Sequence, residues 1–341
     1  MLDQQNPNNG EDFRRKMRQV LDELLANPAT AETHLAPDCV WDAAHPVNQL
    51  VGPEAVRTGF LEPLRAAMPH VHRRDIMFLG GTSRLHERGQ WVACMTHYVG
   101  TMTGPLFGME PSGSMIYLRS GEFYRLDDSG RIAESKIIFD VIDVMRQVWR
   151  LPIPSLGDEI TFPAPITQDG LCPAPRPDRD AFDVVDKMME GLGKYTPGTW
   201  SSEGQTGEDG VWADDMLWYG PAGIGSNYMW DGFVQDHRAP FLISFPDRKG
   251  GHHFCRFGDG DYAAMGGWPS IHATFVADYL GVKATGGPIT MRVMDFYRLD
   301  DRDKLSENWV FIDLAELFFK AGRDLIAESN AMGGKRPMPQ G

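Results

Sequence analysis

The stretch Glu122–Trp149, EFYRLDDSGRIAESKIIFDVIDVMRQVW, occurs a second time as Asp295–Gly322, DFYRLDDRDKLSENWVFIDLAELFFKAG. Both copies have the pattern of a strand, an Asp-rich turn, a second strand and an amphipathic helix. The copies are 173 residues apart, and their register holds without a gap into the helix. A repeat of this length indicates an internal duplication, and each unit is far longer than a solenoid or propeller repeat. We therefore expect two homologous domains.

The composition is that of a globular protein, and its charge argues against some classes of partner. The chain has 341 residues and a formal charge of −14, and it shows no stripe of Lys and Arg, which argues against nucleic acid and anionic membranes. Its four cysteines are widely spaced and are predicted to be free thiols in a reducing compartment. No apolar run is long enough to cross a bilayer, and the first residues lack a signal-peptide pattern. We therefore expect a cytoplasmic protein.

The first half reads as helices followed by strands. Apolar residues at helical spacing predict a helix over residues 13–25, and Gly52-Pro53 opens a second helix. Strands are predicted at 70–79, 90–103, 114–126 and 131–139. Successive strands without a helix between them pair antiparallel. The predicted class is α+β, with a curved antiparallel sheet packed by N-terminal helices.

Seven prolines between residues 152 and 177 indicate a semi-stiff linker, after which the pattern restarts. The second half is predicted to have helices at 182–192 and 227–235, a strand at 216–219 and further strands from 254 to 313. The predicted division is a first domain at 1–150, a linker at 151–179, a second domain at 180–326 and a flexible tail at 327–341.

The stretch Gly100 to Gly113, GTMTGPLFGMEPSG, resembles a signature of SnoaL-like polyketide cyclases, Gly-Thr-His-x-Gly-x-x-x-Gly-x-x-Pro-Thr-Gly. The family's ending, Glu-x-Trp followed by Asp and a helix, resembles Glu307, Trp309 and Asp313. The resemblance implies the nuclear transport factor 2-like fold, a cone of curved sheet closed by helices and open at one end to an apolar pocket. Members of that fold include aldol cyclases, isomerases, dehydratases and epoxide hydrolases, so the fold does not decide the reaction.

The resemblance also implies catalytic residues. In the family, the Asp after the last strand is the general acid/base, which corresponds to Asp140 and Asp313 here. The family's His is replaced by Met102 in the first copy and by Phe275 in the second. Each Asp also precedes an amphipathic helix, where an N-cap is the commonest role of Asp. A pocket carboxylate and a cap therefore both remain open for these two residues.

Strand alternation predicts that Lys136 shares the face of Asp140, and that Glu307 and Trp309 share the face of Asp313. A cation at Lys136 would pair with a carboxylate or bind an enolate oxygen, whereas a bulge would turn it to solvent.

His45 is a candidate hydrogen-bond donor. When the neighbouring prolines of the two copies are aligned, Gly220 stands in its place in the second copy, so this role is expected only in the first domain. The candidate catalytic set is thus Asp140, Asp313 and His45. The residues predicted to line a substrate pocket are Trp41, Tyr98, Met102, Tyr124, Lys136, Trp218, Phe275, Tyr297 and Trp309.

Together these patterns favour a cofactor-independent cyclase, or a related lyase or isomerase, that uses an Asp as general acid/base on a hydrophobic, carbonyl-bearing, polyketide-like substrate. The alternative is a non-catalytic module that binds a small molecule or serves assembly. No metal site is predicted, because His70-x-His72 and His252-His253 lack a third ligand. The first copy keeps more of the motif, so Asp140 is expected to matter more than Asp313.

The tether between the copies raises their effective concentration, so we also expect an intrachain pseudo-dimer through the outer sheet faces. Further homo-oligomerisation stays open.

Overall fold

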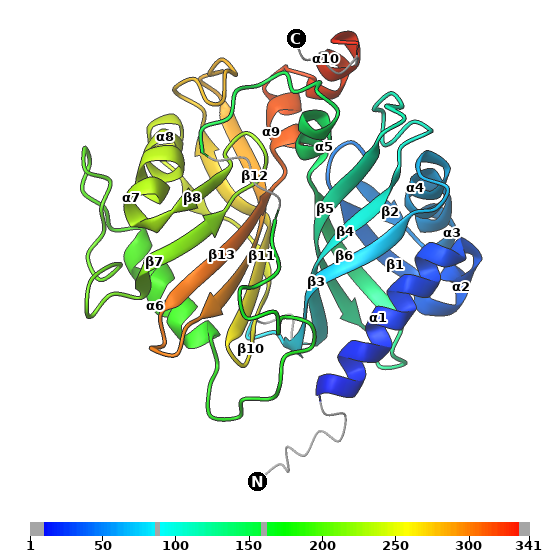
Figure 1. Cartoon of the computed structure of the whole chain (residues 1–341), viewed down its shortest axis with the longest axis horizontal. Helices are drawn as coiled ribbons and strands as arrows, with labels where there is room; N and C mark the ends of the chain where they lie inside the picture. The colour runs from blue at the N-terminus through cyan, green and yellow to red at the C-terminus, as the bar shows by residue number, and fades with distance from the viewer. Residues whose placement is uncertain (1–9, 86–88, 158–161, 334–341) are drawn as a thin grey trace, which may run out of the picture.

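The computed structural model describes residues 10–85, 89–157 and 162–333, which form two α+β domains (Figure 1). The two sheets lie next to each other in the middle of the molecule, and most helices cover their far sides. Both domains are therefore of the predicted α+β class.

The first domain has a sheet in the order β2-β1-β6-β5-β4-β3. Its strands are β1 (Leu35–Ala43), β2 (Gln49–Val51), β3 (His72–Thr82), β4 (Gln90–Thr101), β5 (Met115–Leu126) and β6 (Ile132–Phe139). Its helices are α1 (Gly10–Ala26), η1 (Pro28–Thr30), α2 (Ala31–His34), α3 (Pro53–Val56), the π-helical turn η2 (Arg57–Leu61), α4 (Glu62–Ala67) and α5 (Val141–Gln147).

The second domain repeats this topology, with the sheet order β10-β11-β12-β13-β7-β8 and β9 paired to β11. Its strands are β7 (Trp212–Tyr219), β8 (Ser226–Tyr228), β9 (Lys249–Gly250), β10 (His253–Asp259), β11 (Tyr262–Thr274), β12 (Pro288–Leu299) and β13 (Leu305–Ile312). Its helices are α6 (Phe182–Leu192), α7 (Met229–Phe233), the π-helical turn η3 (Val234–Arg238), α8 (Ala239–Ser244) and α9 (Leu314–Lys320), and α10 (Leu325–Ala331) follows.

Apolar periodicity explains how the helices attach to the sheet. In α1, Met17, Leu21 and Leu24 recur at helical spacing and are all at least 97% buried. In the core beneath the helices, Phe60 of η2 stacks on Phe107, which stacks on Phe139 with ring centroids 4.7 Å apart. The first domain is therefore held by a continuous aromatic core between its helices and its sheet.

The sheets are mixed rather than antiparallel throughout. The strands β3 to β6 pair antiparallel as predicted, but β1 pairs parallel to β6 and β7 pairs parallel to β13. The predicted class holds, and only the direction of this one strand in each domain was wrong. The reason is that β1 and β6 are separated by most of the domain, so no hairpin turn fixes their relative direction.

Strand registers show which residues of the two domains are equivalent. Trp41 pairs with Ser135 in the first domain, and Trp218 pairs with Asn308 in the second. Because Ser135 and Asn308 are 173 residues apart, Trp41 corresponds to Trp218, which is an offset of 177. The turns η2 and η3 and the helices after them keep this offset.

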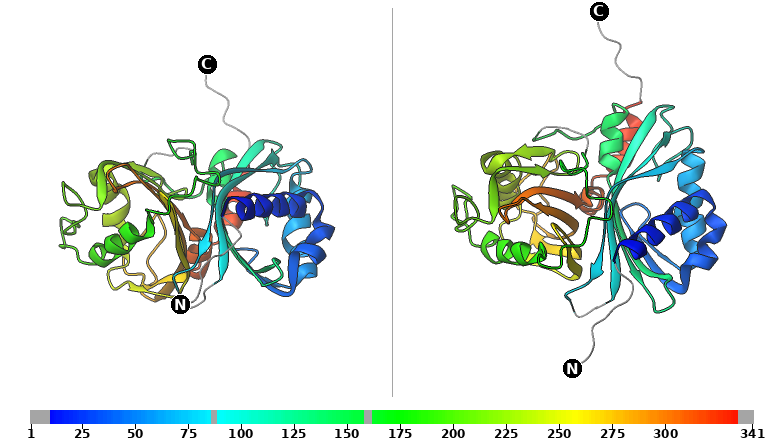
Figure 2. Two further views of the ribbon diagram at one scale, coloured as in Figure 1. Left: turned by 90° about the horizontal axis from the view of Figure 1, so that it is seen from below. Right: turned by 60° about the horizontal axis from the view of Figure 1, so that its bottom comes forward.

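The outer faces of the two sheets pack against each other within the chain (Figure 2). Phe123 on β5 contacts Phe254 and Phe296 of the second domain, with ring centroids 5.3 and 5.6 Å away. Gly121 lies so close to the other sheet that a Cβ atom there would be 2.6 Å from the Phe311 ring. The sheet contact that we expected from the tether is therefore present.

The linker fills the seam between the domains. The Phe162 ring lies 5.0 Å from the Phe311 ring, and the Arg119 guanidinium stacks over Phe162 at 4.3 Å. The backbone N–H of Phe78 donates to Gly170 at 2.8 Å, so the linker also extends the edge of the first sheet. The linker thus connects the two sheets physically as well as covalently.

The prediction of a flexible tail from residue 327 was wrong for its first part. The helix α10 packs on the first domain, where Asn330 accepts from the N–H of Glu110 and donates to the carbonyl of Gly108. Residues 334–341 lie outside the described part of the chain. Buried Leu325 and Ile326 explain the order of this helix, because they give the tail an apolar face.

Candidate active site

A cavity of about 570 Å³ lies in the second domain, between its sheet and its helices. The sheet contributes Asp295 and Tyr297 from β12 and Asn308 from β13, while Met188 of α6 and His237 of η3 line the helical side. The remaining lining side chains are mostly apolar or aromatic. Volumes of about 300–1,000 Å³ are typical of sites for small organic molecules. The cavity thus suits a hydrophobic compound that carries a few polar groups.

Alternation along β13 decides which of its residues reach the cavity. Asn308, Val310 and Ile312 line it, so the residues between them point to the opposite face. Trp309 instead stacks on Tyr219 at 5.3 Å and donates from Nε1 to the carbonyl of Pro163. The prediction that Trp309 faces the pocket was therefore wrong. It assumed that the strand face shared by Trp309 and Asp313 lines the pocket, whereas the opposite face does.

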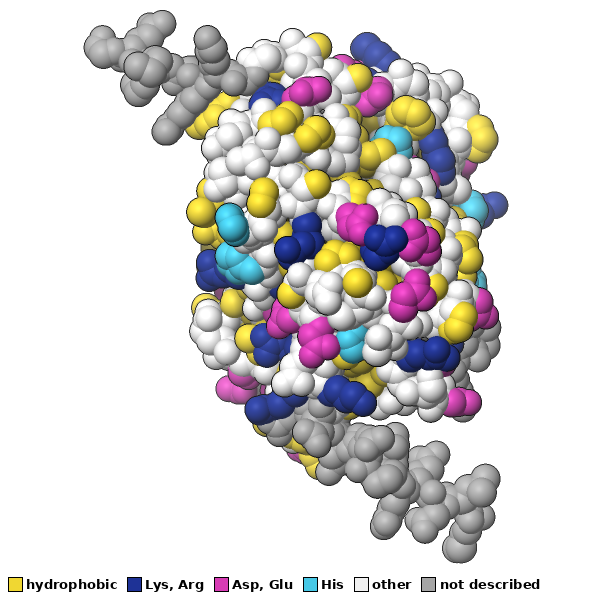
Figure 3. Space-filling view, turned by 90° about the vertical axis from the view of Figure 1, so that its right-hand side faces the viewer, with side chains coloured by type: hydrophobic (Ala, Val, Ile, Leu, Met, Phe, Trp, Pro, Cys, Tyr) yellow, Lys and Arg dark blue, Asp and Glu magenta, His cyan; other side chains and the backbone are white. Residues whose placement is uncertain are grey.

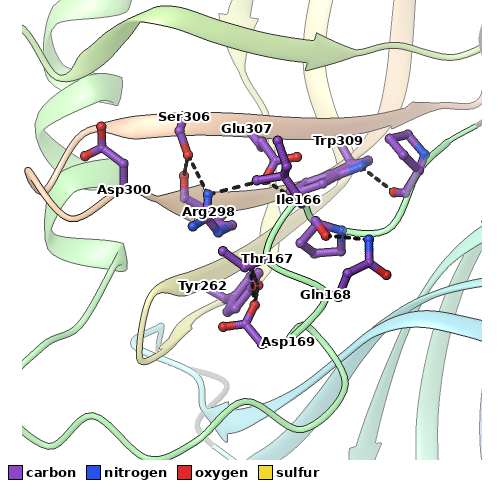
Figure 4. Close-up of polar contacts among 12 residues, drawn as sticks. Ile166, Thr167, Gln168, Asp169, Tyr262, Arg298, Asp300, Ser306, Glu307 and Trp309 are labelled. Carbon is purple, nitrogen blue, oxygen red and sulfur yellow. Dashed lines mark hydrogen bonds and ion pairs between the residues drawn. The ribbon is translucent and has the colours of Figure 1, made fainter.

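Glu307 also points to this outer face and binds the linker (Figure 4). It accepts hydrogen bonds from the backbone N–H of Ile166 and from Tyr219 Oη, each at 3.3 Å, and pairs with Arg298 at 3.4 Å. Burial raises its pKa. The neighbouring Asp169 accepts from Tyr262. Glu307 is thus an anchor for the linker and not a group of the cavity.

Asp295 is the acidic group of the cavity wall. Its carboxyl hydrogen-bonds to Tyr297 and Asn308, and desolvation by burial raises its pKa to about 7. No described cationic side chain forms an ion pair with it within the salt-bridge distance of 4.0 Å. The accessible part of the side chain opens on the cavity that it lines. A carboxyl poised near neutral pH can both accept and return a proton.

The first domain has Glu122 at the position of Asp295, but there the carboxylate is neutralised. Arg73 binds Glu122 at 2.7 Å, and Tyr98 and Tyr124 donate to it at 2.7 and 2.8 Å. Arg73 also pairs with Asp75 at 3.0 Å. Glu122 is fully buried, so the acidic position in this domain belongs to the core.

The registers explain why the second domain is hollow at this point. Gly250 and Ile271 occupy the places that Arg73 and Tyr98 have in the first domain. A missing arginine and a smaller side chain leave space above Asp295, and both Gly250 and Ile271 line the cavity. The same two replacements remove the cation and one of the hydroxyl donors from the carboxyl group.

His237 lies at the π-helical turn η3, where the first domain has Phe60. Its ring stacks on Trp218 with centroids 4.2 Å apart, and its Nδ1 has no hydrogen-bond partner among the described residues. Burial, assisted by the charge of Arg238, lowers the pKa of His237 to about 3. The imidazole is therefore neutral at physiological pH and can donate or accept one hydrogen bond in the cavity. π-Helical turns are frequent at functional sites.

A second histidine, His253, lines the cavity from β10. Arg256 Nε donates to its Nδ1 at 3.1 Å, so a neutral ring carries its proton on Nε2 and donates to Ser270 Oγ at 3.0 Å. Burial lowers its pKa to about 4. His253 is thus fixed in one tautomer by its neighbours.

The comparison with known proteins agrees with this architecture. The family model for SnoaL-like polyketide cyclase matches residues 11–148. Over these residues, the first domain is similar to SnoaL-like polyketide cyclases. No curated protein sequence matches the chain significantly.

Solved structures with similarity to one SnoaL-like domain cover about two fifths of the chain. A protein described as a SnoaL-like polyketide cyclase from Jannaschia sp. CCS1 is 17% identical, with 42% of this chain and 95% of that chain covered and a TM-score of 0.33. TsrD from Streptomyces laurentii is 14% identical, with 43% and 97% covered and a TM-score of 0.33. A protein with a ketosteroid isomerase-like fold from Catenulispora acidiphila DSM 44928 is 16% identical, with 39% and 91% covered and a TM-score of 0.30.

Asp140 of the SnoaL-like first domain is an N-cap at the domain interface. Its side chain accepts from the N–H of Asp143 at 2.9 Å and pairs with Arg119 at 2.8 Å. It also accepts from the N–H of Ala222 in the second domain at 2.8 Å. These partners occupy the carboxylate, and it does not line the cavity. The position therefore gives no support to Asp140 as a general base.

Asp313 of the second domain makes the equivalent contacts: it caps a helix of its own domain and binds a backbone N–H of the first domain. It caps α9 through the N–H of Glu316, pairs with Arg292 at 3.0 Å and accepts from the N–H of His45 in the first domain at 3.0 Å. Burial raises its pKa to about 6. His45 and Ala222 are 177 residues apart, so each domain caps its closing helix with an Asp that also binds the equivalent backbone N–H of the other domain. The alignment of His45 with Gly220 was therefore wrong, because the loops before the two prolines differ in length.

Of the remaining predicted residues, only two line the cavity of the second domain. The His45 ring stacks on Phe319 of the second domain at 4.5 Å, and burial lowers its pKa. Lys136 is buried at the sheet interface, where it pairs with Asp42 at 2.6 Å. Of the predicted pocket residues, Trp218 and Tyr297 line the cavity. The others are buried elsewhere, namely Trp41, Tyr98, Met102, Tyr124, Phe275 and Trp309.

The described residues contain no group of three or more His, Cys, Asp or Glu side chains arranged to hold a metal ion. Within the same ranges, no helix is long and apolar enough to cross a membrane. On the surface of the first domain that is turned away from the second domain, acidic and basic side chains are interspersed (Figure 3).

Proposed function

We propose that the cavity of the second domain is the active site of a cyclase, lyase or isomerase that moves a proton next to a carbonyl group of a hydrophobic substrate. Asp295 is the general acid/base in this proposal. The observation that supports it most is a carboxyl group without a described cationic partner in the wall of an apolar cavity. The similarity of residues 11–148 to SnoaL-like polyketide cyclases supports the same class of chemistry.

The reaction begins when the Asp295 carboxylate takes a proton from the carbon next to a ketone. The electron pair of the C–H bond moves to the carbonyl oxygen and forms an enolate. Return of the proton to another carbon gives an isomer. Attack of the enolate carbon on a second carbonyl forms a carbon–carbon bond, and protonated Asp295 then gives its proton to the new alkoxide. His237 remains neutral, so its N–H is available as a donor to the enolate oxygen.

Proton abstraction can be measured without the natural substrate. In deuterated water, the protein should exchange the α-hydrogens of a bicyclic aromatic ketone such as 2-tetralone, which fits a cavity of about 570 Å³. Proton NMR follows the loss of the α-hydrogen signal. Asp295→Asn should slow the catalysed exchange by about 10²- to 10⁴-fold, the usual contribution of a general base. The rate should rise about tenfold per pH unit below pH 7 and level off above it, because the pKa of Asp295 is about 7.

Asp140→Asn and Asp313→Asn are the matched controls, because both remove a buried carboxylate outside the cavity. Both variants should retain most of the exchange activity, which replaces the expectation that Asp140 is the more important base. Equal losses in all three variants would contradict the proposal. Saturable ketone binding with the same exchange rate in the wild type and Asp295→Asn would favour the non-catalytic binding module instead.

A further inference from the structure

Two arginines, Arg238 and Arg248, line the same cavity. Arg238 ends the π-helical turn η3 and is 4% exposed, while Arg248 lies in the loop before β9. Neither forms an ion pair with a described Asp or Glu within 4.0 Å. Most other arginines near the core have such a partner, as Arg73 and Arg119 show. Both arginines thus face the cavity without a described counter-charge, and the exposed Lys249 is a third cationic side chain in its lining.

The groups that hold Arg238 are neutral. Its Nε donates to the carbonyl of Trp200 at 2.6 Å, and its Nη2 donates to the carbonyl of Leu192 at 2.8 Å and to Ser202 Oγ at 2.6 Å. No described residue accepts a hydrogen bond from its Nη1. These bonds fix the direction of the guanidinium but leave its charge uncompensated, so one edge of it remains available for a ligand.

Tyr195 joins the two arginines. The Arg238 and Arg248 guanidinium carbons lie 5.7 and 5.2 Å from the centre of its ring, and Arg248 also hydrogen-bonds to it. Desolvation lowers the pKa of both arginines, and repulsion by Arg248 lowers the pKa of Arg238 further, to about 10. Both are therefore charged at pH 7. A buried charge without a partner is unfavourable, and an anion that enters the cavity would relieve this repulsion.

The comparison between the domains indicates that this charge is not required by the fold. At the offset of 177, the place of Arg238 is taken in the first domain by Leu61, which is 4% exposed and part of the core. An apolar side chain therefore suffices for packing at this point. The arginine occurs only in the domain that has the cavity.

We propose that the ligand of the second-domain cavity carries a carboxylate group that binds between Arg238 and Arg248, at a distance from its reacting ketone. This proposal rests on the proposed function for the nature of the ligand and specifies its class, a hydrophobic keto acid. A monovalent anion with two oxygens matches the few donors that remain. Asp295 lies on β12 and forms no ion pair within 4.0 Å with Arg238 of η3 or Arg248 before β9, so anion binding and proton transfer can occupy separate parts of the cavity.

The proposal is tested with naphthalene-2-carboxylate and its neutral amide, which have nearly the same shape. Isothermal titration calorimetry should show at least tenfold tighter binding of the carboxylate by the wild type, because hydrogen bonds between charged groups are stronger than those to a neutral amide. Arg248→Gln should reduce this preference about tenfold and leave the affinity for the amide unchanged. Arg248 is chosen for this change because Arg238 also holds the main chain of residues 192–202.

Arg302→Gln is the matched control, because Arg302 is 61% exposed and pairs with Asp300. It should keep the full preference for the carboxylate. Asp295→Asn should also keep or increase the preference, because it removes a negative charge from the cavity. Equal affinity of the wild type for both compounds, or an unchanged preference in Arg248→Gln, would overturn the proposal. Loss of the preference in Arg248→Gln together with unchanged exchange in Asp295→Asn would support the anion site and contradict the proposed catalytic role.

Discussion

In the first domain, Arg73 and Tyr98 fill the space above Glu122, whereas in the second domain the equivalent space above Asp295 belongs to a cavity. The sheets have the same topology and the two acidic residues occupy the same register position. The difference therefore comes from their neighbours. A carboxylate with a buried arginine is part of the core, and a carboxyl without one is a group with a raised pKa that is available to a ligand.

The same contrast extends to the helical side of the interior. Phe60 and Leu61 belong to the aromatic and aliphatic core of the first domain, and His237 and Arg238 take their places around the cavity of the second. The comparison teaches that duplication has left one copy with a filled interior, whose buried polar groups pair with one another, and the other with polar groups that line a cavity. Stability and ligand chemistry are thus assigned to different domains, which can be tested by exchanging or removing these groups.

The largest effect is expected from Arg73→Met. The change leaves Glu122 buried without its cation and Asp75 with Arg18 as its remaining cationic partner, which should lower the free energy of unfolding by about 3–5 kcal/mol at pH 7. Urea denaturation monitored by tryptophan fluorescence measures the loss. The control Arg302→Met breaks only an exposed pair and should cost less than about 1 kcal/mol. A loss below 1 kcal/mol in Arg73→Met would show that Glu122 is not held as a charged core residue.

A smaller effect of opposite sign is expected from Asp295→Asn. The native pKa of about 7 lies well above the ordinary Asp value of 3.8, so the native state keeps a proton that the unfolded chain releases between these pH values. The free energy of unfolding should therefore fall as pH rises from about 4 to 7 and stay low above pH 7. The variant lacks this loss and should be more stable than the wild type by roughly 2–3 kcal/mol at pH 8, after allowance for solvent in the cavity.

Chemical denaturation of the wild type and Asp295→Asn at pH 5 and pH 8 checks this linkage. The two proteins should differ much less at pH 5 than at pH 8. The same difference at both pH values would mean that the Asp295 carboxyl titrates normally in the folded protein.

The smallest effect is expected from His237→Phe, which gives the second domain the residue of the first. The change removes a buried Nδ1 that has no partner among the described residues and should raise the free energy of unfolding by about 1 kcal/mol. It should also reduce ketone exchange in the assay described above. Thermal unfolding and the exchange rate are the two measurements. A destabilised variant with full exchange activity would contradict the role of His237 in the cavity.

The sequence predicts most of the fold because the signals for it are local. The repeat, the apolar periodicity of residues 13–25 and the alternating strands depend only on neighbours along the chain. The direction of β1 and the helical order of residues 327–331 were missed, because each depends on a partner far away in the sequence. The site was missed for the same reason. One available signal was the acidic residue that begins both copies of the repeat, Glu122 and Asp295, because the residues that alternate with it on the same strand face are mostly apolar.

The sequence by itself determined the duplication, the class of each domain and the resemblance of the first copy to SnoaL-like polyketide cyclases. Only the tertiary structure decided which copy is hollow and which acidic residue faces the hollow. The physical reason is that the face of a strand residue and the space above it depend on side chains from other strands and helices. Gly250 opens the cavity by being beside Ile271, and Asp140 is bound by the N–H of Ala222 across the domain interface. Neither contact is readable from local pattern.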